Sequence, residues 1–280
     1  MHSLEGRTVL ITGAALGIGR SLAIALAKAR AALVLVDIAA DALASTASSI
    51  EKFGGRVLVK ATDVTDADSV AALREESRHA FGGVDVLVNN AAIGPHVVSP
   101  RYLIDKPKFW TISDDIWLGM LRVNVFGPQL MTRHFVVDML KRGWGRIVNI
   151  TTSLDTMYRS GTGGYGPCKA ALEAATRIMA QDLADTGVTA NVLVPGGPVN
   201  TRMVPEESGF SKDELIQPGQ MNDPLLWLCS DESNGINGIR IVARKWRVDQ
   251  PLERRLAEAT APVAWPQLGS QSEFPGAAAS

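Results

Sequence analysis

Short apolar runs alternate with longer amphipathic segments along most of the chain. The runs are rich in valine, isoleucine and leucine and lack strict alternation, which is typical of strands covered on both faces. We therefore predict strands at residues 8–12, 32–37, 56–63, 84–91, 145–151, 188–195 and 238–243, and helices at 18–30, 41–53, 66–80, 115–142 and 165–185. Strands that alternate with helices favour right-handed crossovers. The pattern thus predicts an α/β fold with one doubly wound parallel sheet of seven strands and helices on both faces.

This pattern places one domain at residues 1–248, and two long connections interrupt its rhythm. Residues 93–114 follow the fourth predicted strand, and residues 196–222 follow the sixth. Both leave the carboxyl ends of strands, where open α/β sheets bind ligands, so they are candidate binding loops; plain surface excursions are the alternative. After Gln250 the chain is rich in Pro, Ala, Gly and Ser. We expect residues 249–280 to form a tail that is flexible or contacts a neighbouring subunit.

Charge and composition narrow the range of partners. The 28 basic and 29 acidic residues nearly cancel, which argues against nucleic acid or an anionic membrane as a partner. The two cysteines lack metal-ligand spacing and the four histidines form no H-x-x-x-H pattern, so we expect no metal site. The first residues contain no apolar signal core, and charges interrupt the most apolar long stretch. These features favour a cytoplasmic protein that acts on a small molecule.

Gly13, Gly17 and Gly19 lie between the first predicted strand and the first predicted helix, in the run TGAALGIG. Glycines let the backbone turn sharply and approach a pyrophosphate, and the N-terminus of the following helix then faces the negative charge. A glycine triplet alone is weak evidence, because glycine turns are common. The strand before it, the helix after it and an acidic residue downstream make this run a candidate dinucleotide site.

That acidic residue, Asp37, ends the second predicted strand. A carboxylate there can accept hydrogen bonds from the adenosine ribose and would repel a 2′-phosphate. Ala15, Leu16 and Ile38 add no basic group to bind such a phosphate, so the sequence favours NAD(H) over NADP(H). The alternative role of Asp37 is to cap the helix that begins near Asp41.

Two further strand ends carry polar side chains. Asp63 ends the third strand and is a candidate for a hydrogen bond to the adenine amino group, although helix capping around residues 65–68 is the rival interpretation. Asn89, Asn90 and Ala91 end the fourth strand. Small residues there would let the backbone pass close to a cofactor, although both asparagines could equally be turn residues.

Taken together, these motifs resemble the short-chain dehydrogenase/reductase family, which has an NAD(P)-binding Rossmann fold. The resemblance covers about residues 5–245 and rests on TGAALGIG (12–19), Asp37, DV (63–64), NNA (89–91), VNVFG (123–127), GRIVNITTS (145–153), YGPCK (165–169) and VPGGPVNT (194–201). Each piece is weak alone, whereas eight in order are specific. The family's NNAG is NNAA here, and its glycine-rich end of the last strand reads VARKWR. The resemblance implies a homodimer or homotetramer, and the second departure leaves the oligomeric form open.

The resemblance also implies which residues bind the cofactor. They are Gly13, Leu16, Gly17, Ile18, Gly19, Asp37, Asp63, Val64, Asn90, Ala91, Tyr165, Lys169, Pro195, Gly196, Val199 and Thr201.

The family's catalytic pattern is Tyr-x-x-x-Lys on one helix, with a Ser or Thr upstream and an Asn on the preceding long helix. Tyr165 and Lys169 have this spacing, which places both side chains on one helical face. Tyr158 is followed four residues later by Thr162, so it does not match. The resemblance implies that Tyr165 is the acid or base, and that Lys169 lowers its pKa and contacts the nicotinamide ribose. Asn124 would hold a water of the proton relay; its alternative role is to fill a helix kink.

The hydroxyl partner of the tyrosine has two candidates. Thr152 lies thirteen residues before Tyr165, at the position where the family usually has serine, and Ser153 lies one position further along. In extended backbone a step of one residue turns a side chain to the other face, so only one of them can meet the tyrosine. Thr152 is favoured, and a loop one residue shorter than usual would favour Ser153.

These features predict an NAD(H)-dependent oxidoreductase that interconverts a secondary alcohol and a ketone by hydride transfer. The alternatives are a nucleotide-binding sensor or partner protein with little catalysis, and lyase or isomerase chemistry on the same scaffold. Candidate pocket residues are Trp110, Trp117, Trp144, Met157, Tyr158 and Met203. No charged pair within residues 93–114 or 200–217 singles out a substrate carboxylate or phosphate.

Overall fold

The computed structural model describes residues 2–268, and its strands form one sheet of eight in the order β3-β2-β1-β4-β5-β6-β7-β8. The strands are β1 (Thr8–Thr12), β2 (Ala32–Asp37), β3 (Val57–Ala61), β4 (Val86–Asn89), β5 (Gly145–Ile150), β6 (Val188–Val194), β7 (Ile239–Val242) and β8 (Thr260–Pro262). β1 to β7 are parallel, which confirms the doubly wound sheet and all seven predicted strands.

Helices connect these strands. They are α1 (Gly17–Lys28), α2 (Ala40–Glu51), α3 (Ala67–Phe81), α4 (Tyr102–Asp105), α5 (Asp114–Leu121), α6 (Gly127–Arg142), α7 (Leu154–Tyr158), α8 (Tyr165–Asp182), α9 (Asn222–Cys229) and α10 (Leu252–Ala259). The five predicted segments are confirmed as α1, α2, α3, α5 with α6, and α8, whereas α4, α7, α9 and α10 were not predicted. The long helix predicted at 115–142 is α5 and α6 joined by a π-helical turn, Arg122–Phe126. Within residues 2–268, none of the helices has the length and apolar character needed to cross a membrane.

The sheet has one strand more than predicted, and that strand lies in the segment assigned to a tail. β8 runs antiparallel to β7, with Thr260 opposite Ile241, and α10 leads into it. Val263, directly after β8, is fully buried against Val192 and Val194. The count of seven strands is therefore wrong, and so is a flexible tail for residues 252–263. A three-residue strand that contains a proline is too short to show a hydrophobic pattern. Residues 269–280 of the predicted tail lie outside the described residues.

Two apolar cores cover the two faces of the sheet. One packs α1, α2 and α9 against it, with Leu26 and Leu225 among the fully or almost fully buried side chains. The other packs α3, α6 and the end of α8 against the opposite face, with Leu73 and Phe135. This burial on both faces explains why the strands read as continuous apolar runs.

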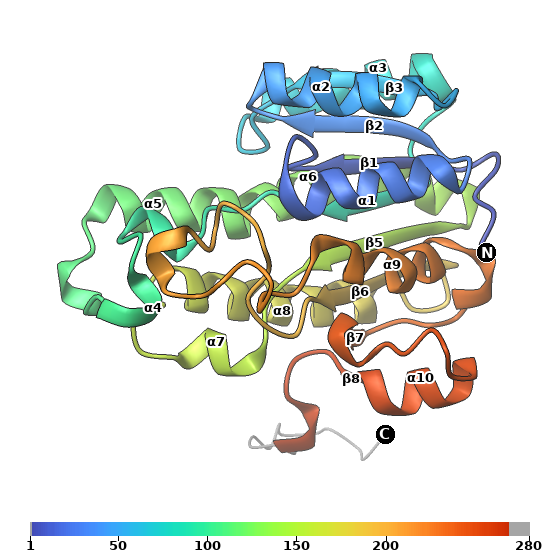
Figure 1. Ribbon diagram of the computed structural model, residues 1–280. Helices are drawn as coiled ribbons and strands as arrows, with labels where there is room; N and C mark the ends of the chain where they lie inside the picture. Colours follow the sequence, from blue (N-terminus) through green and yellow to red (C-terminus); the bar gives the residue numbers. More distant parts are fainter. Residues whose placement is uncertain (1, 269–280) are drawn as a thin grey trace, which may run out of the picture.

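The carboxyl ends of the parallel strands carry the long connections (Figure 1). α4, α5 and α7 gather at this end of the sheet, together with the segment that follows β6, drawn in yellow to orange. The connections pack on one another: Gly94 lies directly against Met203, and Gly161 lies against Lys106. The two long loops of the sequence therefore form a joint wall over the strand ends instead of separate surface excursions.

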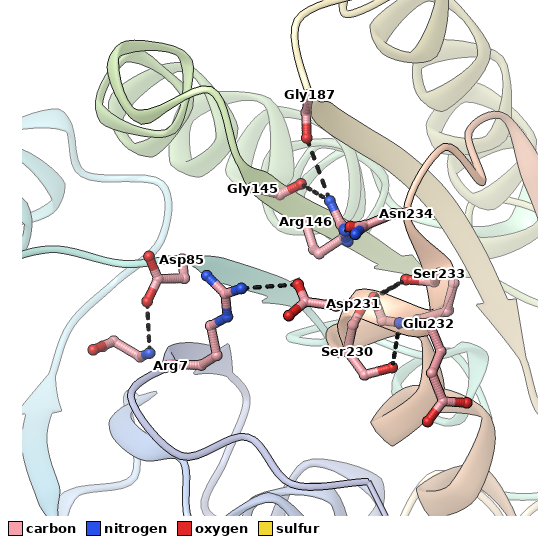
Figure 2. Close-up of polar contacts among 12 residues, drawn as sticks. Arg7, Asp85, Gly145, Arg146, Gly187, Ser230, Asp231, Glu232, Ser233 and Asn234 are labelled. Atoms are coloured by element: carbon pink, nitrogen blue, oxygen red, sulfur yellow. Dashed lines mark hydrogen bonds and ion pairs between the residues drawn. The ribbon is translucent and has the colours of Figure 1, made fainter.

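A cluster of arginines with a structural role lies at the opposite end of the sheet, at the amino ends of β1 and β5. Arg146, at the start of β5, is almost fully buried, and burial lowers its pKa to about 10. Its guanidinium donates to the side chain of Asn234, and Arg7 pairs with Asp231 at 2.8 Å (Figure 2). The guanidinium groups of Arg7 and Arg146 lie 3.6 Å and 4.2 Å, respectively, from the centroid of the Trp144 ring. Trp144, a candidate pocket residue, thus lies at the edge away from the strand ends that carry the long loops.

Candidate functional site

A cavity of about 320 Å³ lies at the carboxyl ends of β1, β2, β4, β5 and β6. Its wall contains most of the predicted site residues, namely Gly13, Leu16, Gly17, Ile18, Gly19, Asp37, Asn90, Ala91, Thr152, Ser153, Tyr165, Lys169, Pro195, Val199 and Thr201. The lining of the cavity does not include Asp63, Val64, Asn124 or Gly196. One cavity therefore joins the glycine run to the tyrosine and lysine, as the motifs predict.

The glycine run forms the turn from β1 into α1, and the sterics there require glycine. Gly13 and Gly17 have positive φ values of +66° and +56°. A Cβ on Gly19 would collide with the carbonyl oxygen of Gly13. The N-cap residue, Leu16, offers no side-chain acceptor, so the first N–H groups of α1 stay available to an anion. This turn, whose backbone N–H groups have no side-chain cap, fits the pyrophosphate of a dinucleotide.

Asp37 and Asn90 hold the glycine turn from two sides. The Asp37 carboxylate accepts hydrogen bonds from the backbone N–H groups of Ala15 at 3.1 Å and Ala39 at 3.0 Å. The Asn90 amide donates to the carbonyl oxygens of Thr12 at 2.9 Å and Gly13 at 3.0 Å. Both side chains also face the cavity, where a nucleoside would meet them.

Asp63 and Val64 lie outside the cavity lining. The Asp63 carboxylate accepts hydrogen bonds from the backbone N–H and the hydroxyl of Thr65, at 2.8 Å and 2.9 Å, while Asp66 caps α3. Val64 is buried against Gly127 of α6. The turn interpretation of Asp63 describes its contacts in this structure, and a role in binding adenine stays a prediction.

Tyr165 and Lys169 occupy the first turns of α8 and are both buried. The Lys169 ammonium lies 5.8 Å from the Tyr165 ring centroid and donates to the carbonyl oxygen of Ile150 at 2.9 Å. Burial lowers the pKa of Lys169 to about 8. Burial also raises the pKa of Tyr165, as does the neighbouring Tyr102, and the side chain of Thr152 opposes this. Desolvation therefore sets the direction of the Tyr165 shift in this structure, and the lowering of its pKa by Lys169 stays a prediction.

The two candidate hydroxyls have different partners. The side chain of Thr152 lies near that of Tyr165 and lowers the pKa of the tyrosine. The Ser153 hydroxyl instead pairs with the hydroxyl of Thr156 at 3.0 Å, at the start of α7. This arrangement follows from the one-residue step at the end of β5, and it favours Thr152 as the partner of the tyrosine.

Asn124 lies in the π-helical turn between α5 and α6 and is fully buried. Its amide oxygen accepts from the backbone N–H of Ile93, and its amide nitrogen donates to the Ile93 carbonyl, both at 2.8 Å. The side chain therefore fixes the start of the long connection after β4. The alternative role, filling a helix kink, matches this π-helical turn. The Asn124 side chain there also hydrogen-bonds the cavity-lining loop that begins at Ile93 to the helix.

A buried ion pair lies behind the catalytic candidates, and the sequence motifs do not contain it. The Glu173 carboxylate, on α8, accepts from Arg240 of β7 at 2.7 Å and from the hydroxyl of Thr151 at 3.0 Å. Arg240 also donates to the carbonyl oxygen of Thr152 at 2.9 Å. The spacing could have indicated Glu173, because it follows Tyr165 and Lys169 at steps of four along one face of a helix.

The substrate end of the cavity differs most from the sequence prediction. Of the six candidate pocket residues, only Met203 lines the cavity, and Tyr158 is 77% exposed. The lining residues that were missed include the apolar Ile93, Val97 and Leu103 and four residues with polar side chains: His96, Tyr102, Arg159 and Arg202. Burial raises the pKa of Tyr102 to about 12, and burial holds the pKa of His96 below its usual value. No pattern in the sequence connects these four residues, because they come from three separate connections.

Within residues 2–268 no three His, Cys, Asp or Glu side chains are grouped so as to hold a metal ion. The arrangement of the cavity supports redox chemistry with an organic cofactor: an anion-binding turn at one end, and a tyrosine, a hydroxyl and an ammonium at the other.

Comparison with known proteins agrees with this arrangement. A family model described as short chain dehydrogenase matches residues 7–210. A short-chain type dehydrogenase/reductase of Picea abies is 35% identical over 84% of this chain and 89% of its own length. The cis-4-hydroxycyclohexanecarboxylate dehydrogenase of Sinomonas cyclohexanicum is 34% identical over 83% of this chain and 92% of its own.

A solved structure from Beutenbergia cavernae, assigned as an NAD(P)-dependent gluconate 5-dehydrogenase, holds NADP at low occupancy. It superimposes with a TM-score of 0.71 at 30% identity, over 86% of this chain and 95% of that one. Since the family model covers more than half of the residues and the relatives align over most of them, this chain belongs to the short-chain dehydrogenases, oxidoreductases that act on CH–OH or C=O groups with a nicotinamide cofactor.

Proposed function

We propose that this chain interconverts a secondary alcohol and a ketone with NAD(H), and that Tyr165 moves the proton. The observation that carries the proposal is that Thr152, Tyr165 and Lys169 line the same cavity as the glycine turn. A relative named for a 4-hydroxycyclohexanecarboxylate supports this substrate class, since a ring hydroxyl at that position is a secondary alcohol.

A nicotinamide bound in the cavity would supply or accept the hydride. Because its pKa is raised, Tyr165 is protonated at neutral pH, which is the state that donates to the oxygen of a ketone. Thr152 would donate to the same oxygen and stabilise the charge that forms there. An ammonium has three donors and Lys169 uses one on Ile150, so two remain for a ribose.

In the oxidation direction Tyr165 must accept the proton of the alcohol. A phenolate is stabilised by a nearby ammonium, and Lys169 is the cation one turn along the helix. Lys169 carries its charge below a pH of about 8. The Asn124 amide makes one accepted and one donated hydrogen bond to the backbone of Ile93, which leaves one lone pair and one N–H, and its role in holding a water of the proton relay stays a prediction.

The preference for NAD(H) rests on Asp37. Its carboxylate lies in the cavity wall at the end of β2, where it would accept from ribose hydroxyls and repel a 2′-phosphate. Ile38, the next residue, is exposed and brings no positive charge. A comparison of kcat/KM for NAD⁺ and NADP⁺ with one alcohol tests this preference, and a higher value for NADP⁺ would contradict it.

The experiment for the proton transfer compares two tyrosines. Tyr165→Phe removes the proposed acid and should lower kcat by about 100- to 10,000-fold, the usual contribution of general acid–base catalysis. NADH binding, measured by fluorescence titration, should persist. Tyr158→Phe is the matched control, because Tyr158 is exposed and bonds only Asp155 in this structure. Full turnover by Tyr165→Phe would remove the proposal.

A further inference from the structure

Two arginines line the tyrosine end of the cavity without a counter-ion. Arg159 directly follows α7, and Arg202 belongs to the connection after β6. Within residues 2–268, neither guanidinium forms an ion pair, and neither donates a hydrogen bond. Within residues 2–268 some exposed arginines have a carboxylate, such as Arg247 with Asp249 at 2.8 Å, and others, such as Arg133, do not; Arg159 and Arg202 differ from both in that they line the cavity.

The cavity wall itself supplies no carboxylate for them. Among the described residues that line the cavity, Asp37 is the only acidic one. It lies beside the glycine turn and already accepts two backbone hydrogen bonds there, from Ala15 and Ala39. The other ionisable groups of the lining are cationic or neutral at neutral pH. The reactive end of the cavity therefore carries a positive excess.

Both arginines line the cavity together with side chains around Tyr165. Met203, next to Arg202, packs into the same apolar cluster as Tyr165, and Gly94 lies directly against Met203. The charge of Arg202 contributes to the lowered pKa of His96. The charge of Arg159 acts on Tyr102, which in turn acts on Tyr165. The two guanidinium groups thus approach the reactive end from two different connections.

A guanidinium is a planar fork of donors that matches a carboxylate and is desolvated more easily than an ammonium. Two unpaired forks in the wall of one cavity attract an anion from solution and fix its orientation. We infer that the alcohol or ketone taken by this site bears a carboxylate, and that Arg159 and Arg202 bind it. This inference rests on the proposed function, because it places the carboxylate on the molecule whose hydroxyl meets Tyr165.

The phosphates of the cofactor are a second possible source of negative charge. Thr201, the neighbour of Arg202, contacts the position where a Cβ of Gly17 would lie. The glycine turn and the N-terminus of α1 already provide an anion site, however, and Arg159 comes from the connection after β5, next to Tyr102. This distribution favours the substrate over the cofactor as the partner of the arginine pair.

The test measures binding by calorimetry to the chain saturated with NADH. The probes are acid and amide pairs of rising size: butyrate and butyramide, cyclohexanecarboxylate and cyclohexanecarboxamide, 4-phenylbutyrate and 4-phenylbutyramide. We expect the best-bound acid to bind at least about tenfold more tightly than its amide, as for a charge-assisted bidentate pair, and less tightly at high salt. Arg159→Gln and Arg202→Gln should each remove most of that difference. Arg133→Gln, an exposed arginine of α6, is the matched control and should keep it.

Three results would overturn the inference: no preference for the acid in any pair, a preference that survives both substitutions, or weaker NADH binding in Arg202→Gln with the preference intact. The last result would assign the arginine to the phosphates of the cofactor. Turnover of neutral secondary alcohols is measured in parallel. Turnover of neutral alcohols without a preference for the acid would reject the inferred substrate carboxylate and leave the proposed function intact. A preference for the acid without turnover of any alcohol would reject the proposed function and leave the carboxylate site intact.

Discussion

At the residue scale, the choice between Thr152 and Ser153 depends on a step of one position at the end of β5. Thr152 lowers the pKa of Tyr165, whereas the Ser153 hydroxyl is hydrogen-bonded to that of Thr156. We predict that Thr152→Val lowers kcat by about 100- to 1,000-fold, as expected for loss of one donor to a developing oxyanion. Ser153→Ala should stay within a few-fold of the unmodified protein in a steady-state assay. The opposite order would make Ser153 the partner.

The ionisation of the tyrosines is a second prediction at this scale. All three tyrosines of the chain have a pKa above the usual 10: Asp155 raises that of Tyr158, and burial raises those of Tyr102 and Tyr165. At a pH above 10, where these tyrosines ionise, Lys169 is already neutral, since its pKa is about 8. Burial therefore disfavours the charged forms of both side chains in the free protein.

Ultraviolet absorbance of tyrosinate measures this directly. Between neutral pH and pH 10, fewer than half of the tyrosines should ionise, because each pKa lies above 10. Tyr158→Phe should remove the first step seen above that pH, since Tyr158 is the exposed one. If Tyr165→Phe abolishes a tyrosinate signal that the unmodified protein shows near pH 8, the ammonium outweighs burial and the structural interpretation is wrong.

At the scale of elements, the Glu173–Arg240 pair links α8 to β7 and to the end of β5. Both side chains are almost fully buried, so loss of one partner leaves an uncompensated charge, at a cost of about 3–5 kcal/mol. We predict that Glu173→Gln lowers the free energy of urea unfolding by this amount. It should also lower kcat, because Arg240 no longer holds the carbonyl of Thr152 in place.

Two comparisons separate positioning from general instability. The variant Glu258→Gln breaks an exposed pair with Arg254, and should change the unfolding free energy by less than about 1 kcal/mol. The double variant Glu173→Gln/Arg240→Gln has no unpaired charge and should regain stability, but not kcat. Recovery of both quantities in the double variant would mean that the pair stabilises the fold without positioning Thr152.

The same elements show how far the sequence could predict the structure. The seven parallel strands and five helices were predictable, because burial on both faces gives each strand a continuous apolar run. Tyr165 and Lys169 were predictable because one helical turn separates them. Arg159, Arg202 and Tyr102 were not, since they meet only through the packing of three irregular connections. β8 was missed because three residues are too few to set a period.

At the scale of the whole molecule, one exposed apolar face lies away from the cavity. An apolar groove runs between the π-helical turn and α8, and includes Leu121, Phe126 and Leu172. Phe126 is 46% exposed, and Ile178 of α8 is 58% exposed. Exposed patches of this kind mark interaction sites in soluble proteins. We propose that a second copy of the chain covers this face, which would form the expected homodimer or homotetramer.

Light scattering tests this proposal through the mass in solution. We predict at least twice the chain mass for the unmodified protein, and the mass of one chain for Ile178→Glu and for Phe126→Glu, because burial of a carboxylate in an apolar interface is unfavourable. Phe53→Glu is the matched control: Phe53 is 45% exposed but lies after α2, away from the groove. If only Phe53→Glu dissociates the protein, the interface lies near the end of α2 and not at the groove. Ile178→Glu lies away from the cavity lining, so NADH binding by the resulting monomer would show that the dinucleotide site is complete within one chain.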